Sequence, residues 1–296
     1  MGIDILKQKV KFKCANNGAE EIPKELFKLT GSGFPGIHTN MNDMVKLSKG
    51  LKNYRKDTIC KLPFCATVEA EALGASINLG DERIGPRVKN YAFNTIEELI
   101  NIKDIDLCRG RIGQVLDSVE NLSDQNEVVC LNIEGPFTII SSLVDPGIFY
   151  SAIRKKRDIV DKFMHFIEEN LAAYALEGIK RGAKIISYAD PAGAMDIVGP
   201  KTYKDLSGKS SCNLLKSVLE NKGDFIIHLC GKMSTALEEL GFCTSLQVEY
   251  DKKFTYGEAI NLLFKNDEDA KIIGHSCIKR TPLKIKKPII WNIKLN

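Results

Sequence analysis

The sequence predicts an α/β fold built on a parallel sheet, and three observations support this prediction. From about residue 128 onward, short apolar runs alternate with longer stretches whose apolar residues recur at helical spacing. This alternation is typical of βα units, which form parallel sheets. Polar residues repeatedly follow the apolar runs, at the edge of such a sheet where active sites form. With 44% hydrophobic and 27% charged residues, the 296-residue chain has the composition of a globular protein with a large core.

Five apolar runs are predicted to be strands, each followed by residues suited to chemistry or to a tight turn. We expect strands at 128–133, 184–188, 225–229, 245–248 and 271–273. The polar residues predicted to share one edge of this sheet are Glu134, Asp190, His228 with Cys230, Glu249 and Cys277.

Helices are predicted between these strands. The expected helical ranges are 151–180, 203–221, 231–240 and 258–264, with less regular helical segments at 41–51 and 95–102. The sequence has no internal repeat and no convincing linker, so we expect a single domain over residues 1–296. Periodicity alone leaves two architectures open, a (β/α)₈ barrel and a doubly wound open sheet.

Charge and cysteine content restrict the classes of function. The net charge of +4 is small and the lysines are scattered, so we expect no binding to nucleic acid. No stretch approaches 18 apolar residues, so we expect no membrane span. The N-terminus shows no signal-peptide pattern, which predicts a cytoplasmic protein. In that reducing compartment the nine cysteines indicate metal binding or catalysis rather than disulfides.

His228, Cys230 and Cys277 form the most informative pattern of the chain. Imidazoles and thiols are ligands of Zn²⁺, and three protein ligands leave an open position, as in catalytic zinc sites. His228 and Cys230 end a predicted strand, where residues two apart point to the same face. A buried Cys can also be a small hydrophobic filler, so spacing alone leaves both interpretations open.

Several motifs together resemble the uroporphyrinogen decarboxylase superfamily. They are Leu62-Pro63-Phe64, Glu69-Ala70-Glu71-Ala72-Leu73-Gly74-Ala75, Glu134-Gly135-Pro136-Phe137-Thr138, Tyr188-Ala189-Asp190-Pro191-Ala192-Gly193 and His228-Leu229-Cys230-Gly231. The resemblance covers roughly residues 35–282 and is strongest to the branch of cobamide-dependent methyltransferases that methylate coenzyme M. It implies a TIM-type (β/α)₈ barrel with a catalytic zinc ion, whose ligand positions fall on His228, Cys230 and Cys277.

The resemblance also implies a reaction and its partners. A methyl group would move from a methylcobamide, carried by a corrinoid protein, to a small thiol such as coenzyme M. Bound to zinc, a thiol is deprotonated and remains nucleophilic. Asp190 and Glu134 are the candidate catalytic residues. Asp190 is expected to orient the substrate or the zinc-binding His, although an Asp before Pro is also a common turn former.

Two features depart from the family pattern. Only 46 residues lie between Cys230 and Cys277, a spacing shorter than in the methyltransferases. We therefore expect a barrel shortened by about one βα unit near the C-terminus, with the basic tail 279–296 covering the gap or contacting a partner. His275 is the second departure, because a fourth protein ligand would make the zinc site closed and structural. We expect the open site.

Three other functions stay open. A porphyrinogen decarboxylase would use no metal and would need an arginine-rich N-terminal segment, but Arg55 is the only arginine before Leu62. A degenerate barrel could bind zinc or a corrinoid protein without turnover. A methyltransferase acting on the donor side of the corrinoid protein is a variant of the leading hypothesis. The sequence determines neither the thiol acceptor nor the oligomeric state.

Overall fold

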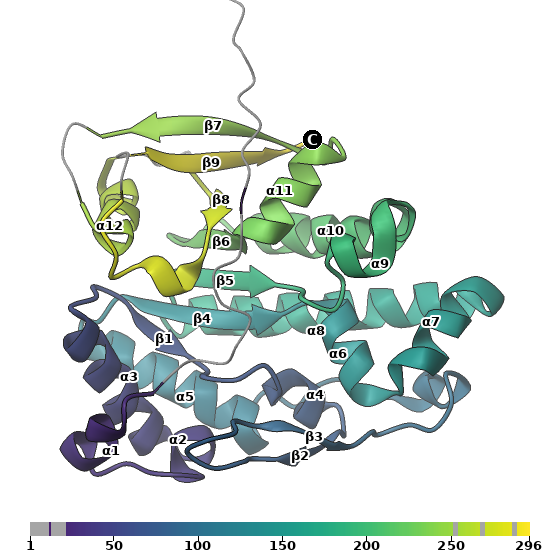
Figure 1. Cartoon of the computed structure of the whole chain (residues 1–296), viewed down its shortest axis with the longest axis horizontal. Helices are drawn as coiled ribbons and strands as arrows, with labels where there is room; N and C mark the ends of the chain where they lie inside the picture. The colour runs from purple at the N-terminus through teal and green to yellow at the C-terminus, as the bar shows by residue number, and fades with distance from the viewer. Residues whose placement is uncertain (1–11, 13–21, 251–253, 267–269, 286–288) are drawn as a thin grey trace, which may run out of the picture.

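The alternation predicted from residue 128 onward is present in the computed structural model, which describes residues 12, 22–250, 254–266, 270–285 and 289–296. All five predicted strands form, as β4 to β8, and four further strands were not predicted (Figure 1). In chain order the strands are β1 (Cys60–Leu62), β2 (Ser76–Asn78), β3 (Arg87–Asn90), β4 (Val129–Glu134), β5 (Ile185–Ala189), β6 (Ile226–Cys230), β7 (Cys243–Glu249), β8 (Ile272–Ser276) and β9 (Ile289–Leu295).

Helices connect these strands. The α-helices are α1 (Lys24–Thr30), α2 (Gly36–Thr39), α3 (Met41–Arg55), α4 (Val68–Ala72), α5 (Gly110–Asp124), α6 (Pro136–Leu143), α7 (Pro146–Lys155), α8 (Arg157–Lys180), α9 (Met195–Thr202), α10 (Gly208–Leu219), α11 (Gly231–Glu239) and α12 (Tyr256–Asn266). Three short segments have other helical geometry: η1 (Glu97–Asn101), η2 (Tyr203–Ser207) and η3 (Ile278–Arg280).

The predicted helix 151–180 is divided into α7 and α8. Lys156 interrupts it with a non-helical backbone (φ −141°, ψ 48°). Within the described ranges no single helix is long and apolar enough to cross a membrane, and only α6 with α7, bent by 115°, pass such a test together.

The main sheet has the strand order β1-β4-β5-β6-β8-β9-β7. Its first five strands are parallel, as predicted from the βα alternation. β9 is antiparallel to both β8 and β7. β1 and β7 are therefore the two end strands, and no pairing between them is present among the described residues.

The antiparallel end of the sheet bears on two predictions, the pairing of the segment 245–248 and the place of the tail 279–296. The segment 245–248 was expected to pair in a parallel sheet, but it belongs to β7, which pairs with β9 in antiparallel fashion over seven residues. Because β9 is also antiparallel to β8, β7 runs in the same direction as β8 without pairing with it. β9 lies in the tail 279–296, so this part of the tail is a sheet strand between β8 and β7. An apolar run predicts a strand but not its neighbour in the sheet, because the neighbour depends on which segment the chain reaches.

The two faces of the parallel sheet have different environments. On one face, Leu131, Ile186 and Ile227 pack into the large core formed with the surrounding helices. On the opposite face, which we call the inner face, Cys130, Ile185 and Ile226 pack against apolar side chains of α12. Residues adjacent along a strand point to opposite faces, so both sets are buried without breaking the alternation.

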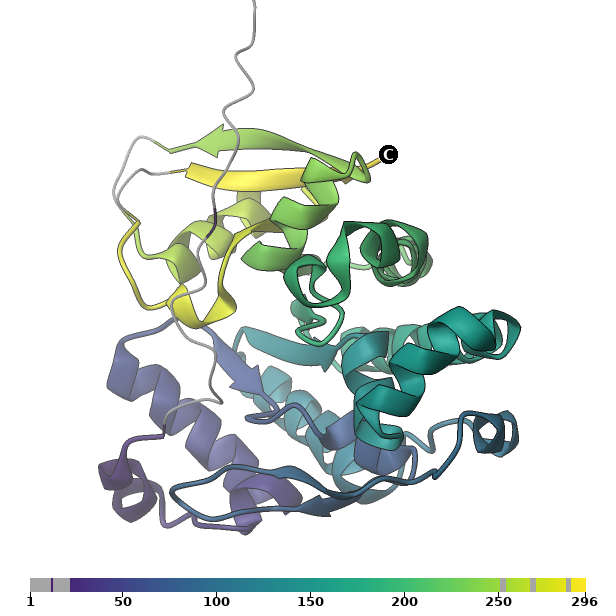
Figure 2. The same cartoon turned by 45° about the vertical axis from the view of Figure 1, so that its right-hand side comes forward.

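α12 covers only one end of the inner face. Its buried residues contact the first inner residue of β4, β5 and β6, at the end where these strands begin. Figures 1 and 2 agree that α12 lies on this side, whereas α6 and α7 lie on the side where β4 ends. The remaining inner face, toward the ends of the strands, is the region that carries polar residues.

Candidate functional site

A row of polar side chains crosses the middle of the inner face. The register of the parallel strands aligns Asn132 of β4 with Ser187 of β5, and Ser187 with His228 of β6. His228 is followed by Ile273 of β8 in the same row. Aligned residues of parallel strands share a face, so these polar groups lie beside one another above the apolar layer that α12 covers.

His228 is buried at 1% exposure, and neither of its ring nitrogens has a hydrogen-bond partner among the described residues. Its ring packs edge-to-face against Tyr256, with ring centroids 5.8 Å apart. Burial, with a smaller contribution from the charge of Lys61, lowers the pKa of His228 to about 4. His228 is therefore neutral at physiological pH, the form in which imidazole binds metal ions.

Cys230 lies two residues beyond His228 on β6 and shares its face by strand alternation, as predicted. Its aligned neighbour on β8 is Ser276. In a regular strand the neighbour would be His275, because His228 aligns with Ile273. One extra residue in β8 produces this shift, which is a β-bulge with His275 at φ 54°.

The bulge directs His275 into a network away from His228. Its Nδ1 lies 3.1 Å from Thr235 Oγ1, and its Nε2 lies 2.7 Å from Ser245 Oγ and 3.2 Å from Glu238 Oε2. The ring also packs against Trp291 of β9. Both ring nitrogens are thus engaged by groups of α11 and β7. That His275 is not a fourth zinc ligand stays a prediction.

Cys277 follows the last residue of β8 and precedes η3. It acts electrostatically on the phenol of Tyr256, the residue that packs on His228. The three proposed ligands are nevertheless not gathered as one donor set. In the part of the chain that the structure describes, no group of three His, Cys, Asp or Glu side chains is placed to hold a metal ion.

The fit to zinc therefore differs among the three residues. His228 fits best, because a neutral buried imidazole with two unpartnered nitrogens needs a ligand or a donor. Cys230 fits by its position on the same face of β6. Cys277 is close to the site through Tyr256, and its role is the least supported of the three.

Asp190 is a helix cap in this structure. Its carboxylate accepts hydrogen bonds from the backbone N–H of Phe137 and Thr138 (3.1 and 2.9 Å), from Thr138 Oγ1 (2.7 Å) and from the N–H of Gly193 (3.3 Å). α6 begins after Gly135, which has no side chain to cap it. Asp190 supplies that acceptor from the end of the neighbouring strand.

Gly135 and Asp190 depend on each other. A Cβ atom at position 135 would lie 2.3 Å from the Cβ of Asp190. The motifs around Glu134 and Asp190 therefore form one structural unit at the ends of β4 and β5. This supports a positioning role for Asp190 over direct contact with a substrate.

Glu134 and Glu69 form a buried pair of carboxyl groups at the end of β4. The backbone N–H of Glu134 donates to Glu69 Oε1 at 3.1 Å, and Glu134 Oε2 has no partner among the described residues. Burial raises the pKa of Glu69 to about 7. Burial, then the charges of Glu69 and Asp190, raise the pKa of Glu134 well above its usual value. These effects favour the protonated form of Glu134.

Arg111 organises a second polar cluster next to this pair. Its guanidinium donates to the backbone oxygen of His38 (2.9 Å), to Thr67 Oγ1 (3.2 Å), to Glu71 Oε2 (3.2 Å) and to Cys65 Sγ (2.8 Å). Arg111 and Glu69 were not predicted as site residues. Glu69 lies within a resembling motif, but only the fold brings Arg111, on α5, to the end of β1.

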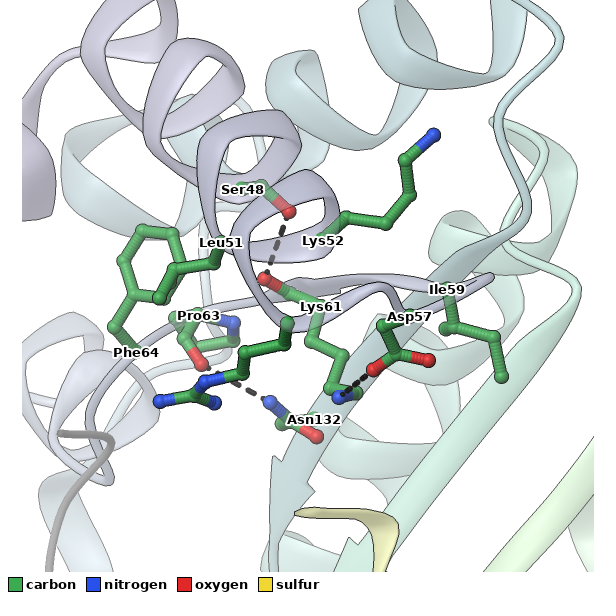
Figure 3. A pocket seen from close by; sticks show the side chains of 10 residues that line it. Ser48, Leu51, Lys52, Asp57, Ile59, Lys61, Pro63, Phe64 and Asn132 are labelled. Carbon is green, nitrogen blue, oxygen red and sulfur yellow. Dashed lines mark hydrogen bonds and ion pairs between the residues drawn. The ribbon is translucent and has the colours of Figure 1, made fainter. Parts of the chain in front are cut away.

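A pocket beside β1 meets the polar row at Asn132 (Figure 3). It has an empty volume of about 330 Å³ and is lined by Ser48, Leu51, Lys52, Arg55, Asp57, Ile59, Lys61, Pro63, Phe64 and Asn132. Asn132 Nδ2 donates to the backbone oxygen of Pro63 at 3.0 Å. Lys61 Nζ pairs with Asp57 Oδ2 at 2.6 Å, which fixes the charge that lowers the pKa of His228.

Residues 19–275 match the family model described as uroporphyrinogen decarboxylase (URO-D), a range that contains His228 and Cys230 and ends before Cys277. The methylcobamide:CoM methyltransferase MtaA of Methanosarcina barkeri strain Fusaro is 28% identical over 259 residues, covering 85% of this chain and 74% of that protein. The methylcobamide:CoM methyltransferase MtbA of Methanosarcina mazei is 24% identical over 254 residues, covering 85% and 74%.

The fold is also similar to a solved methyltransferase from Methanosarcina mazei, with a TM-score of 0.65, 24% identity and coverage of 73% of this chain and 72% of that one. The predicted α/β fold of the TIM-barrel type is confirmed by this likeness and by the family model. The loss of one βα unit near the C-terminus stays a prediction. Because the family model matches far more than half of the sequence, the chain belongs to the uroporphyrinogen decarboxylase family.

Proposed function

We propose that this protein is a methyltransferase that moves a methyl group from a methylated corrinoid protein to a small thiol such as coenzyme M. The names of its relatives support this proposal, since MtaA and MtbA are methylcobamide:CoM methyltransferases. The observation that carries it is the buried, neutral His228, whose two ring nitrogens have no partner in the described structure. Such a residue on a polar inner face is suited to bind a metal ion.

We propose that His228, Cys230 and Cys277 hold this ion, which would be Zn²⁺. When bound, zinc would deprotonate the acceptor thiol and keep its sulfur nucleophilic next to two cysteine thiolates. For His228 to take part, it must remain neutral, and its burial and the nearby charge of Lys61 ensure this. The three side chains would have to lie nearer one another than the described structure places them.

The acidic residues have distinct proposed roles. Burial and the neighbouring carboxylates raise the pKa of Glu134 and so favour its protonated form, in which the carboxyl group can donate a hydrogen bond to a bound substrate. Asp190 acts as a positioning residue, because its carboxylate holds the start of α6. We further propose that one domain carries the whole site, that the corrinoid protein approaches the strand ends and that the protein works in the cytoplasm.

The proposal predicts thiol-dependent demethylation of methylcobalamin, which is followed by the spectral change as the methyl group leaves cobalt. Purified protein should contain close to one zinc per chain. Cys230→Ser should lower both the zinc content and the rate by at least about tenfold, because loss of a thiolate ligand weakens metal binding strongly. Metal analysis and a panel of thiols, including 2-mercaptoethanesulfonate, measure these quantities.

The matched control is Cys243→Ser. Cys243 is a buried cysteine of β7, the edge strand beyond β9, and its substitution should leave zinc content and rate unchanged. Equal zinc loss in both variants would show that the chosen thiols are wrong. Zinc binding without demethylation by any thiol would favour a non-catalytic binding barrel, and consumption of uroporphyrinogen would favour a decarboxylase.

A further inference from the structure

Two buried polar side chains on the inner face lie against each other without hydrogen-bond partners. His228 and Tyr256 are 1% and 3% exposed and pack edge-to-face. Among the described residues, neither ring nitrogen of His228 has a hydrogen-bond partner, and the hydroxyl of Tyr256 has none either. Buried polar atoms without a partner are rare in native proteins, and two adjacent residues with this property indicate a place where a ligand binds.

The position of Tyr256 is fixed by the start of α12. Its backbone N–H donates to the oxygen of Leu283 at 2.9 Å, which joins α12 to the segment after η3. The next residue, Gly257, is held in the same way by the oxygen of Thr281 at 2.8 Å. The Tyr256 ring therefore has a defined place beside His228 and is not a side chain at a loose chain end.

The hydroxyl of Tyr256 is directed toward the end of β8. Burial raises the pKa of Tyr256, a weak hydrogen-bonding contact with the Ser276 side chain lowers it, and the charge of Cys277 raises it. Ser276 is thus close, although no hydrogen bond of normal geometry reaches the phenol oxygen. Tyr256 therefore lies between the ring of His228 and the end of β8, and its phenol has one O–H group to donate.

We propose that Tyr256 donates a hydrogen bond to the sulfur atom of the acceptor thiol bound beside His228. This inference rests on the function proposed above and adds a substrate-binding residue to it. An anionic sulfur is the acceptor that best matches a buried phenol donor next to a neutral imidazole, because a charged acceptor strengthens the bond. The thiol would thereby be held in place, at the cost of some of its nucleophilicity.

The test is Tyr256→Phe, which removes the hydroxyl and keeps the ring against His228. Zinc content should be unchanged, whereas the Kd of 2-mercaptoethanesulfonate, measured by calorimetry on the zinc-loaded protein, should rise roughly tenfold. The KM for this thiol should rise similarly, with kcat lowered by no more than about twofold, because the bond is made to the bound thiol and not only in the transition state. The Tm of the metal-free variant should equal or exceed that of the metal-free wild type, since an unpaired buried hydroxyl is lost.

Tyr188→Phe is the matched control. Tyr188 is equally buried, lies on β5 facing the helices, and its hydroxyl donates to Ser211 at 3.1 Å. This variant should have a lower Tm than the wild type and an unchanged Kd for the thiol. Unchanged thiol binding in Tyr256→Phe would overturn this inference alone. A fall in its metal-free Tm as large as that of Tyr188→Phe would also overturn it, since the hydroxyl would then have a structural partner such as a bound water. If the wild type binds no thiol, both this inference and the proposed function fail.

Discussion

At the scale of single residues, the environment of each histidine decides what it can do. His228 and His275 both precede a cysteine by two positions, so the sequence does not distinguish them. In the structure His228 has no partner for either ring nitrogen, whereas His275 is engaged by Thr235, Ser245 and Glu238. The difference arises from one inserted residue in β8, which a pattern of apolar residues does not reveal.

Glu69 is a residue whose importance depends on burial. It was noted only as part of a motif, and no sequence feature indicates that its carboxyl group is almost fully buried next to Glu134. The pair lies at the end of β4, beside the polar row that contains His228. The protonation state of this pair therefore sets the charge next to the polar row.

Replacing Glu69 with Gln should change how stability depends on pH. Burial raises the pKa of Glu69 from 4.5 to about 7, so its contribution is fully present below pH 4.5 and is lost as the pH rises through 7. In the wild type this contribution falls by roughly 3 kcal/mol across that interval, at 1.36 kcal/mol per unit. Gln mimics the protonated acid, so the variant should resemble the wild type near pH 5 and exceed its stability near pH 8.

Urea denaturation between pH 5 and pH 8 measures this difference. The exposed Glu82, in the loop between β2 and β3, provides the control, and Glu82→Gln should retain the wild-type profile. Parallel profiles for the wild type and Glu69→Gln would contradict the assignment of a raised pKa to Glu69.

At the scale of elements, the start of α6 shows how two strand ends cooperate. Gly135 precedes the helix without a capping side chain, and Asp190 from the end of β5 accepts the N–H groups of Phe137 and Thr138. The sequence alone suggests that an Asp before Pro forms a turn. It cannot show which helix the carboxylate caps, because that depends on the pairing of β4 with β5.

Asp190→Ala should therefore destabilise the protein by about 3 kcal/mol, the sum of a lost cap and of buried donors left without an acceptor. Asp145→Ala is the control, since Asp145 caps α7 at an exposed position by accepting the N–H of Gly147 at 2.8 Å. Its loss should be about 1 kcal/mol. Chemical denaturation gives both values. Unchanged stability in Asp190→Ala together with abolished methyl transfer would instead make Asp190 a catalytic residue.

At the scale of the whole molecule, the sequence predicted the parallel part of the sheet well. Strands β4, β5, β6 and β8 follow from short apolar runs between helical stretches. β1 was missed because it is three residues long, and β9 because its segment was considered only as a basic tail. The antiparallel pairing of β7 with β9 depends on contacts distant in the sequence, which local periodicity does not encode.

The candidate site likewise combines residues that local sequence patterns predict with residues that only the fold brings together. Strand alternation correctly placed His228 and Cys230 on one face, since this depends only on residues two apart. Tyr256 was missed because it comes from α12, which covers the inner face and whose position no local pattern reveals. The assignment of Cys277 as third ligand came from its residue type and from the resemblance, with no local geometry to support it, and Cys277 lies outside the residues that match the family model.

X-ray absorption at the zinc edge, with and without saturating thiol, tests the central claim most directly. An open site of His228, Cys230 and Cys277 should show two sulfur ligands, rising to three when the thiol binds. His275→Ala should give the same counts, because His275 is engaged by α11 and β7. A sulfur count that does not change with thiol, together with zinc loss in His275→Ala, would mean a closed structural site and would contradict the proposed methyl transfer.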